Sequence, residues 1–231
     1  LRRRNFSGHA GRRTRRPAAV TLDLPLYSAA EFRRRALAQK GAPIDLAFRE
    51  HGDFLLNPDL WASLEGIRLK DAAVLVPVVD DGDDAKVIFT QRTTKLRKHS
   101  GQIAFPGGAI DPEDRNAESA ALREATEEIG LDAGFVEPVA RLPQYLAATG
   151  FRITPILSVV KRGFHLTLNP HEVESVFEVP LSFLMNPANH TRDSSVWQGI
   201  ERHFYRMPYE DWMIWGITAG IVRTLYERLY A

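Results

Sequence analysis

The chain has 231 residues, of which 44% are hydrophobic and 26% charged, and its net charge is +1. This is the composition of a globular protein with a sizeable core, which argues against a disordered or fibrous chain. Cysteine is absent, which excludes disulfides, thiol nucleophiles and cysteine-bound metals and fits the cytoplasmic location that we expect. No apolar run reaches the roughly 20 residues of a membrane helix, and no apolar segment follows the first arginines, so we expect neither membrane association nor a secretory signal.

The positive charge is concentrated at the start of the chain. Residues 1–20 contain seven arginines and no acidic residue, which leaves the other 211 residues at a net charge of −6. Aromatic side chains do not alternate with these arginines as they do in strand-binding surfaces, so we do not expect a nucleic-acid partner. We predict a solvated basic arm over residues 1–21, a helical extension over 22–70 and the main domain over 71–231.

Local patterns predict helices and strands along the whole chain. Ser28-Ala-Ala-Glu31 is a capping-box pattern that opens a helix toward Gly41. Apolar runs at 72–79 and 86–92, separated by an Asp-Gly turn, predict a hairpin. Further expected elements are a helix over 117–129 between Asn116 and Gly130, strands at 135–142, 151–160 and 174–179, and a last helix over 211–229. The mixture indicates an α/β domain with antiparallel strand pairs, in which Trp212 and Trp215 belong to the core.

Three glutamates share one face of the helix expected over 117–129. Glu124, Glu127 and Glu128 are spaced i, i+3 and i+4, which brings their Cβ atoms within about 5–6 Å of one another. Because like charges at this spacing destabilise a helix, the arrangement is favourable when a hard cation binds, and Mg²⁺ prefers such oxygen ligands. The opposite face carries side chains that suit packing on a sheet: Ala121, Leu122, Ala125 and Ile129.

The residues around this triplet strengthen the interpretation. On its own, a glutamate triplet is most often a solvated acidic face. Here Gly107-Gly108 permits a tight turn and a close approach of the backbone to phosphate, and Gly130 supplies a C-cap. Arg123 can reach back to an upstream acid and hold the loop against the helix. The combination favours a metal and phosphate site.

The same segment resembles a known family. Arg123-Glu-Ala-Thr-Glu-Glu-Ile-Gly-Leu131 after the double glycine is similar to the Nudix box, G-x5-E-x7-R-E-U-x-E-E-x-G-U with U aliphatic, if Ala125 counts as aliphatic. In one place the match departs: the expected glutamate position, counted from Gly108, falls on Asp114, and one extra residue precedes Arg123. Either Asp114 or Glu113 can therefore pair with Arg123. The resemblance implies the Nudix fold, in which a mixed β-sheet is sandwiched between helices.

A second motif precedes the box. Residues 88–108 resemble the element L-L-T-x-R-(S/A)-x3-R-x3-G-x3-F-P-G-G of coenzyme A pyrophosphatases, although Ile88 and Phe89 replace leucines and Thr93 replaces Ser or Ala. The residues in register are Thr90, Arg92, Arg97, Gly101 and Phe105 to Gly108. With the long spacing to Arg123 and the segment 215–223, the likeness to this subfamily covers about residues 70–229.

The resemblance implies a metal-dependent hydrolysis of a diphosphate linkage. Mg²⁺ or Mn²⁺ would bind Glu124, Glu127 and Glu128, and the favoured substrate is coenzyme A or an acyl-CoA, giving 3′,5′-ADP and 4′-phosphopantetheine. The residues expected to contact the substrate are Arg92, Arg97, Gly107 and Gly108, and Arg123 orients the box. Glu127, Glu128 and Glu172, the last in an Asn-Pro loop, remain alternatives for the general base.

Two other functions stay open on the sequence. One is a Nudix hydrolase of another nucleotide, such as ADP-ribose or a dinucleoside polyphosphate. The other is a non-catalytic module that binds a nucleotide or RNA, although such a module would be expected to lose its metal carboxylates and all three are present here. A homodimer is an assembly compatible with the sequence.

Overall fold

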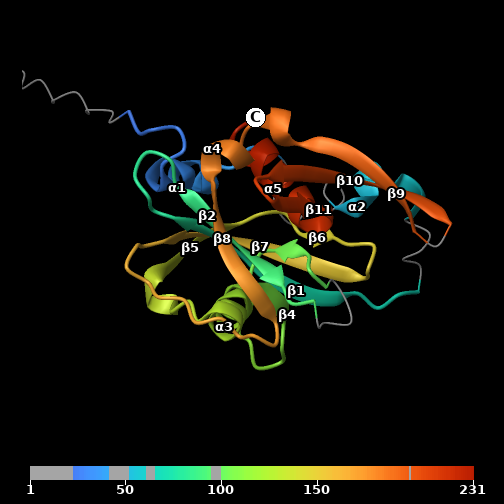
Figure 1. The fold of residues 1–231 in the computed structure, drawn as a ribbon, viewed down its shortest axis with the longest axis horizontal. Helices are drawn as coiled ribbons and strands as arrows, with labels where there is room; N and C mark the ends of the chain where they lie inside the picture. The colour runs from blue at the N-terminus through green and yellow to red at the C-terminus, as the bar shows by residue number, and fades with distance from the viewer. Residues whose placement is uncertain (1–22, 42–51, 61–65, 95–99, 198) are drawn as a thin grey trace, which may run out of the picture.

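The computed structural model describes residues 23–41, 52–60, 66–94, 100–197 and 199–231 (Figure 1). The arm expected over residues 1–21 and the substrate-binding candidate Arg97 lie outside these ranges. The helices are α1 (Ala29–Leu37), α2 (Asp53–Leu56), α3 (Ala117–Ile129), α4 (Leu181–Leu184) and α5 (Gly216–Leu229). The strands of the main sheet are β1 (Lys70–Val79), β2 (Lys86–Arg92), β3 (Ile103–Ala104), β4 (Gly107–Ala109), β5 (Val136–Arg141), β6 (Tyr145–Leu146), β7 (Phe151–Val160) and β8 (Val173–Pro180).

The N-cap of α1 forms only half of the expected capping box. Ser28 Oγ accepts a hydrogen bond from Glu31 N at 3.3 Å. The backbone N–H of Ser28 donates to Pro25 O instead of to the Glu31 carboxylate. That carboxylate pairs with Arg34 and Arg35 one turn further along the helix. The helix therefore begins where the pattern predicts, but Glu31 in its first turn forms ion pairs instead of capping the helix.

Strand β1 lies at the centre of a mixed sheet with the order β3-β2-β1-β7-β5. It pairs in parallel with β7 along its whole length and antiparallel with β2 only near the turn, at Val78↔Val87 and Val79↔Lys86. Beyond that point the two strands of the expected hairpin separate, and β4 pairs with β1 while β3 pairs with β2. This opening places the Gly107-Gly108 turn inside the sheet beside β1, where it can meet α3.

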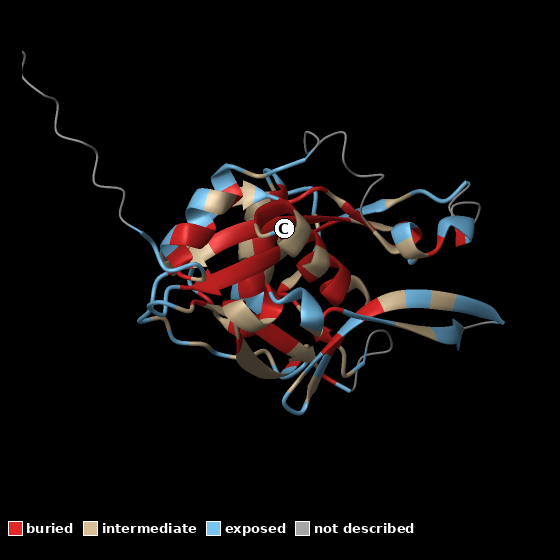
Figure 2. Ribbon diagram, turned by 90° about the horizontal axis from the view of Figure 1, so that it is seen from above, coloured by how far each residue is buried: buried red, intermediate tan, exposed pale blue. Residues whose placement is uncertain are grey.

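Helices cover both faces of the sheet, which confirms the expected fold class. Along β1, Ala73 and Leu75 pack on the α3 side, whereas Val76 and Val78 join the core beneath α1 and α5, as the two-residue period of a strand requires. Figure 1 shows α3 on one face and α1 and α5 on the other, and Figure 2 shows that the strands in the middle of the molecule are largely buried. The apolar face predicted for α3 is confirmed, because Ala121, Ala125 and Ile129 are buried there.

A second sheet was not expected from the sequence. It has the order β11-β10-β9, with β9 (Thr191–Trp197), β10 (Ile200–Tyr209) and β11 (Trp212–Trp215). The helix expected over 211–229 is therefore wrong in its first turn: the chain reverses at Glu210, which has a φ of 49°, and α5 begins only at Gly216. Trp212 stacks on Phe177 with 4.3 Å between ring centroids, but Trp215 is exposed rather than part of the core.

The β9–β10 hairpin extends away from the main sheet (Figures 1 and 2). Its outer part exposes the apolar side chains of Val196 and Ile200. The helices in the described part of the chain are too short or too polar to span a bilayer.

Candidate active site

Both ends of helix α3 are fixed by local interactions. Asn116 Oδ1 accepts from Ser119 N at 2.8 Å, and Ser119 Oγ accepts from Asn116 N at 3.0 Å, which makes a reciprocal capping box. At the other end Gly130 has a φ of 67°, and a Cβ there would lie 2.8 Å from Thr167 N. Glycine is therefore required, because it lets the chain reverse while the loop around Thr167 crosses the end of the helix.

Glu128 is the most buried carboxylate of the site, with a side chain that is 2% exposed. Its Oε2 accepts from Gly107 N at 3.1 Å, and its Oε1 accepts from the Arg92 guanidinium at 3.2 Å. Burial raises the pKa of Glu128 to about 7, and the charges of Glu124 and Glu172 act in the same direction against these two donors. Burial therefore disfavours the ionised form of Glu128 more strongly than its two hydrogen-bond donors favour it.

Glu124 lies directly over the glycine turn. A Cβ added to Gly108 would lie 2.5 Å from the Glu124 carboxylate, and one added to Gly107, whose φ is 155°, would lie 2.4 Å from Ala73 O. Gly107 is required because the backbone of β1 approaches the turn too closely for a side chain, whereas a side chain at Gly108 would displace the Glu124 carboxylate. Burial raises the pKa of Glu124, Arg123 opposes that shift, and the nearby charge of Glu172 adds to it.

Glu127 occupies the outer side of the site, with a side chain that is 54% exposed. It pairs with the Arg123 guanidinium at 3.0 Å, and so does Glu124 at the same distance. The three glutamates therefore share a helix face, as expected, but Glu127 reaches toward solvent whereas Glu128 points into the fold.

The structure shows which upstream acid pairs with Arg123. Its guanidinium donates to both carboxylate oxygens of Asp114, at 2.9 and 3.2 Å, and to Ala109 O. Asp114 also accepts from Asp111 N, and the hydrogen bonds from Arg123 lower its pKa. Asp114, and not Glu113, is thus the residue that ties the loop to α3.

The loop that follows β7 brings Glu172 to the same site. Asn169 N donates to Glu128 O at 2.9 Å, and Thr93 N donates to the backbone O of Glu172 at 2.9 Å. The charge of Glu172 contributes to the raised pKa of both Glu124 and Glu128, so its carboxylate lies near theirs. The sequence predicted this acid, and the structure brings it together with the box glutamates.

Asn169 is a site residue that the sequence reasoning did not single out. Its Nδ2 donates to Glu172 Oε1 at 3.1 Å, and its Oδ1 accepts from His171 N at 3.1 Å. The Asn-Pro pair at 169–170 is a recognisable turn signal, since Asn side chains bond the backbone two residues on. That signal identifies the turn, but the contact with Glu172 depends on the fold.

The charge pattern fits a divalent cation. Within the described residues, no three His, Asp or Glu side chains form a ready-made metal cage, and the glutamates of α3 pair with Arg92 and Arg123. The available ligands are carboxylate oxygens, which a hard cation such as Mg²⁺ prefers. Glu124 and Glu128, whose pKa values are raised, would gain from a positive charge between them. The donor set therefore suits a metal that replaces the arginine contacts.

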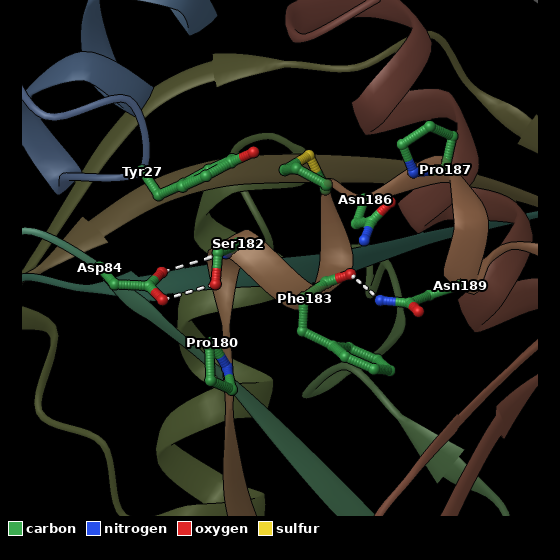
Figure 3. Close-up of a pocket in the computed structure, with 9 residues that line it drawn as sticks. Tyr27, Asp84, Pro180, Ser182, Phe183, Asn186, Pro187 and Asn189 are labelled. Atoms are coloured by element: carbon green, nitrogen blue, oxygen red, sulfur yellow. Dashed lines mark hydrogen bonds between the residues drawn. The ribbon is translucent and has the colours of Figure 1, made fainter.

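A cavity of about 560 Å³ lies at the other end of β8, near α4 (Figure 3). It is lined by Tyr27, Asp84, Pro180, Ser182, Phe183, Met185, Asn186, Pro187 and Asn189. The one carboxylate among these residues, Asp84, accepts from Ser182 N and Oγ, and no lysine or arginine of the described part of the chain lines the cavity. It offers no cation for a phosphate group, so we place the active site at α3.

Comparisons with known proteins agree with this geometry. The NUDIX domain matches residues 69–211. The Nudix hydrolase NudL of Citrobacter koseri is 39% identical over 171 residues, which cover 74% of this chain and 88% of that protein. NudL of Escherichia coli K12 is 36% identical over the same shares of the two chains.

Solved structures of similar proteins overlap more loosely. A MutT/nudix family protein from Enterococcus faecalis has a TM-score of 0.44 at 15% identity, over 86% of this chain and 73% of that one. The NUDIX domain of Shewanella oneidensis NrtR, solved with ADP ribose, has a TM-score of 0.40 at 19% identity, over 56% and 82%. The assignment rests on the sequence matches: the chain belongs to the Nudix hydrolase family, whose members act on nucleotide diphosphate derivatives and generally use divalent metal ions.

Proposed function

We propose that the chain hydrolyses the diphosphate bridge of coenzyme A or an acyl-CoA, giving 3′,5′-ADP and 4′-phosphopantetheine. Mg²⁺ or Mn²⁺ would bind Glu124, Glu127 and Glu128. The observation that carries the hydrolytic site is the contact of two carboxylates with the glycine turn: the buried Glu128 accepts from Gly107 N, and the partly buried Glu124 packs over Gly108. A divalent cation bound to these carboxylates would lie beside the glycine turn, whose backbone would approach a phosphate group of the substrate.

The choice of coenzyme A is supported by the motif ahead of the box. Coenzyme A carries a ribose 3′-phosphate as well as a diphosphate bridge, so it needs cationic side chains beyond the metal site. Arg92 lies within the site, at 3.2 Å from Glu128. Arg97, the second motif arginine, lies outside the described residues and would supply a further phosphate contact.

The chain's own residues suggest how the reaction proceeds. A bound divalent cation would neutralise phosphate charge and lower the pKa of an attacking water. Glu172, oriented by Asn169, would accept the proton as the water oxygen forms its bond to one phosphorus and the bridging P–O bond breaks. Arg123 acts as a positioning residue, because its hydrogen bonds to Asp114 and Ala109 O tie the loop to α3.

A product assay tests the proposal. The protein would be incubated with coenzyme A, ADP-ribose and diadenosine tetraphosphate, each with Mg²⁺ or Mn²⁺, and the products identified by mass. We expect 3′,5′-ADP from coenzyme A and a kcat/KM for it at least about tenfold above the others, because its extra phosphate adds charge-assisted contacts. Hydrolysis of ADP-ribose with none of coenzyme A would contradict the substrate and leave the hydrolase class standing.

A further inference from the structure

Arg92 is held at the junction of three site segments. Strand β2 is irregular between Gln91 and Arg92, where its register with β8 shifts. The backbone of Arg92 bonds on both sides to the 101–102 turn, its N–H donating to Gln102 O at 3.0 Å and its carbonyl accepting from Gly101 N at 3.1 Å. Such an irregularity re-aims a side chain relative to a regular strand. The backbone is thus fixed while the guanidinium reaches across to α3.

The hydrogen bond between Arg92 and Glu128 is long, but Arg92 supplies the positive charge that is paired with this carboxylate. A single guanidinium nitrogen approaches Glu128 Oε1 at 3.2 Å, which is longer than the fork-shaped pairs that arginine forms with carboxylates. Among the described residues, Arg92 is the one basic side chain paired with Glu128. The arginine is also 25% exposed, so its remaining N–H groups are within reach of a ligand.

Arg123, in the same site, differs from Arg92 because its guanidinium has several partners. It donates to both oxygens of Asp114 and to Ala109 O, in addition to its contacts with Glu124 and Glu127. A cation that binds the glutamates leaves Arg123 with the loop contacts. Arg92 has no comparable second anchor for its guanidinium among the described residues, so the loss of Glu128 as a partner would free it.

We infer that Arg92 changes partners during the binding cycle: it neutralises Glu128 while no metal is bound, and it turns to the diphosphate of the substrate once a divalent cation takes over Glu128. The inference rests on the proposed function. It makes cation and diphosphate bind cooperatively, since the cation releases the arginine that the diphosphate needs. Neither ligand alone would then bind with its full affinity.

Metal affinity separates this role from a structural one. Mn²⁺ binding would be measured by electron paramagnetic resonance for the wild type, Arg92→Gln, Arg92→Lys and Arg33→Gln. Arg33 lies on α1, on the opposite face of the sheet, where it pairs with Glu137, so its variant removes the same charge far from the site. We expect Arg92→Gln to bind Mn²⁺ about tenfold more tightly than the wild type, because a competing positive charge is gone. The lysine and Arg33 variants should stay within about threefold.

Coupling to a diphosphate gives the second readout. The probe is adenosine 5′-(α,β-methylene)diphosphate, whose bridge is not hydrolysed, with its Kd measured by calorimetry with and without saturating Mg²⁺. The Mg²⁺-dependent gain in affinity should fall at least about fivefold in Arg92→Gln, since the released arginine is missing. In the wild type, the ¹⁵Nε signal of Arg92, identified by its absence in Arg92→Lys, should shift when Mg²⁺ is added and again when the probe is added.

The outcomes separate the two proposals. If Arg92→Gln has the amide spectrum of a folded protein but binds Mn²⁺ as well as or less well than the wild type, Arg92 merely supports the fold. An unchanged Mg²⁺-dependent gain in affinity for the probe would also overturn the proposed change of partner. The proposed function survives either result as long as the wild type binds Mn²⁺ and Glu128→Gln weakens that binding. If the wild type binds no Mn²⁺, both proposals fail.

Discussion

Two buried glutamates, on helices that cover opposite faces of the sheet, respond to neighbouring arginines in opposite ways. Glu31 on α1 and Glu128 on α3 are both less than 10% exposed, and each is bonded by guanidinium groups. The hydrogen bonds from Arg34, joined by those from Arg35, lower the pKa of Glu31 to about 2, whereas burial raises the pKa of Glu128 to about 7. Burial and an arginine partner therefore do not by themselves determine the charge state of a carboxylate.

The difference lies first in which effect dominates at each group: the hydrogen bond from Arg34 outweighs burial at Glu31, whereas burial outweighs the hydrogen-bond donors at Glu128. Glu31 accepts three hydrogen bonds of 2.7 Å from Arg34 and Arg35, and no acidic neighbour contributes to its shift. Glu128 has one guanidinium contact at 3.2 Å and faces the charges of two further carboxylates. The α1 carboxylate belongs to a complete ion pair that supports packing, whereas the α3 carboxylate belongs to a site that is short of positive charge, as perturbed groups at functional sites often are.

The largest expected effect comes from removing the charge of Glu128. Glu128→Gln should lower kcat/KM by about 10³-fold, because a metal ligand contributes several kcal/mol of transition-state stabilisation. The free energy of unfolding without metal at pH 8 should stay the same or rise, since the fold disfavours the ionised form of this residue. Kinetics and urea unfolding of the same preparation check both. If the variant loses both activity and stability, Glu128 has a structural role like that of Glu31.

Glu127→Gln provides the matched variant on the outer side of the helix. Glu127 is exposed and bonded to Arg123, so its removal should leave the fold intact. We expect turnover to fall by about 10²-fold or more if it binds the metal. Near-normal turnover would remove Glu127 from the metal site and leave Glu124 and Glu128 as its carboxylates.

The effect of losing Glu172 should lie between those expected for the two box glutamates. Glu172→Gln removes the proposed general base and should lower kcat by about 300-fold, within the usual range for such groups, with little change in KM. Glu174→Gln, two residues further along and exposed, is the control and should retain wild-type activity. A kcat within about threefold of wild type in Glu172→Gln would transfer the role of base to a box glutamate.

The parts of the molecule that the sequence predicts well are those set by local chemistry. Helix α3 has the predicted bounds because Asn116 and Gly130 cap it with bonds to residues a few positions away. The i, i+3, i+4 spacing likewise places Glu124, Glu127 and Glu128 on one helix face. The hairpin of β1 and β2 follows from its apolar runs and the Asp-Gly turn. In each case the deciding contacts lie within one turn or one hairpin.

The parts that the sequence does not predict depend on distant pairing. Trp212 to Trp215 have a composition that suits a helix or a strand, and pairing with β10 decides for strand β11. The unequal burial of Glu127 and Glu128 depends on where Gly107 meets α3, 21 positions away in sequence. The contact of Arg92 with Glu128 joins β2 to α3 across 36 positions. No local pattern records such contacts.

A smaller effect on activity is expected from crowding the glycine turn. Gly108→Ala would put a methyl group 2.5 Å from the Glu124 carboxylate, so Glu124 must move. A displacement of about 1 Å at a catalytic group costs about 100-fold in kcat/KM. Gly199→Ala meets no atom within 4 Å but has a φ of 78°, so it should lower stability by about 1 kcal/mol without loss of activity. An active Gly108→Ala enzyme would show that the position of Glu124 is not critical.

The smallest expected effect is on stability alone, at Glu31. Its pKa in the folded protein, about 2, lies below the ordinary value of 4.5, so the folded state favours the ionised form. The stabilisation is fully present above pH 4.5 and is lost as the pH falls toward the folded value. Glu31→Gln should therefore lower the free energy of unfolding by roughly 2 kcal/mol at pH 7 and leave kcat unchanged.

Urea unfolding of wild type and Glu31→Gln between pH 7 and pH 3 measures this dependence. The difference between the two proteins should shrink steadily below about pH 5, because protonation of Glu31 in the wild type removes the same ion pair that the variant lacks. Glu227→Gln is the control: it breaks a single partly exposed pair with Arg223 on α5, so its effect should be at most about 0.5 kcal/mol. If the difference in unfolding free energy between wild type and Glu31→Gln does not depend on pH, the glutamine destabilises the protein because it packs poorly. Arg34 and Arg35 would then not stabilise an ionised carboxylate, and this contrast between α1 and α3 would be lost.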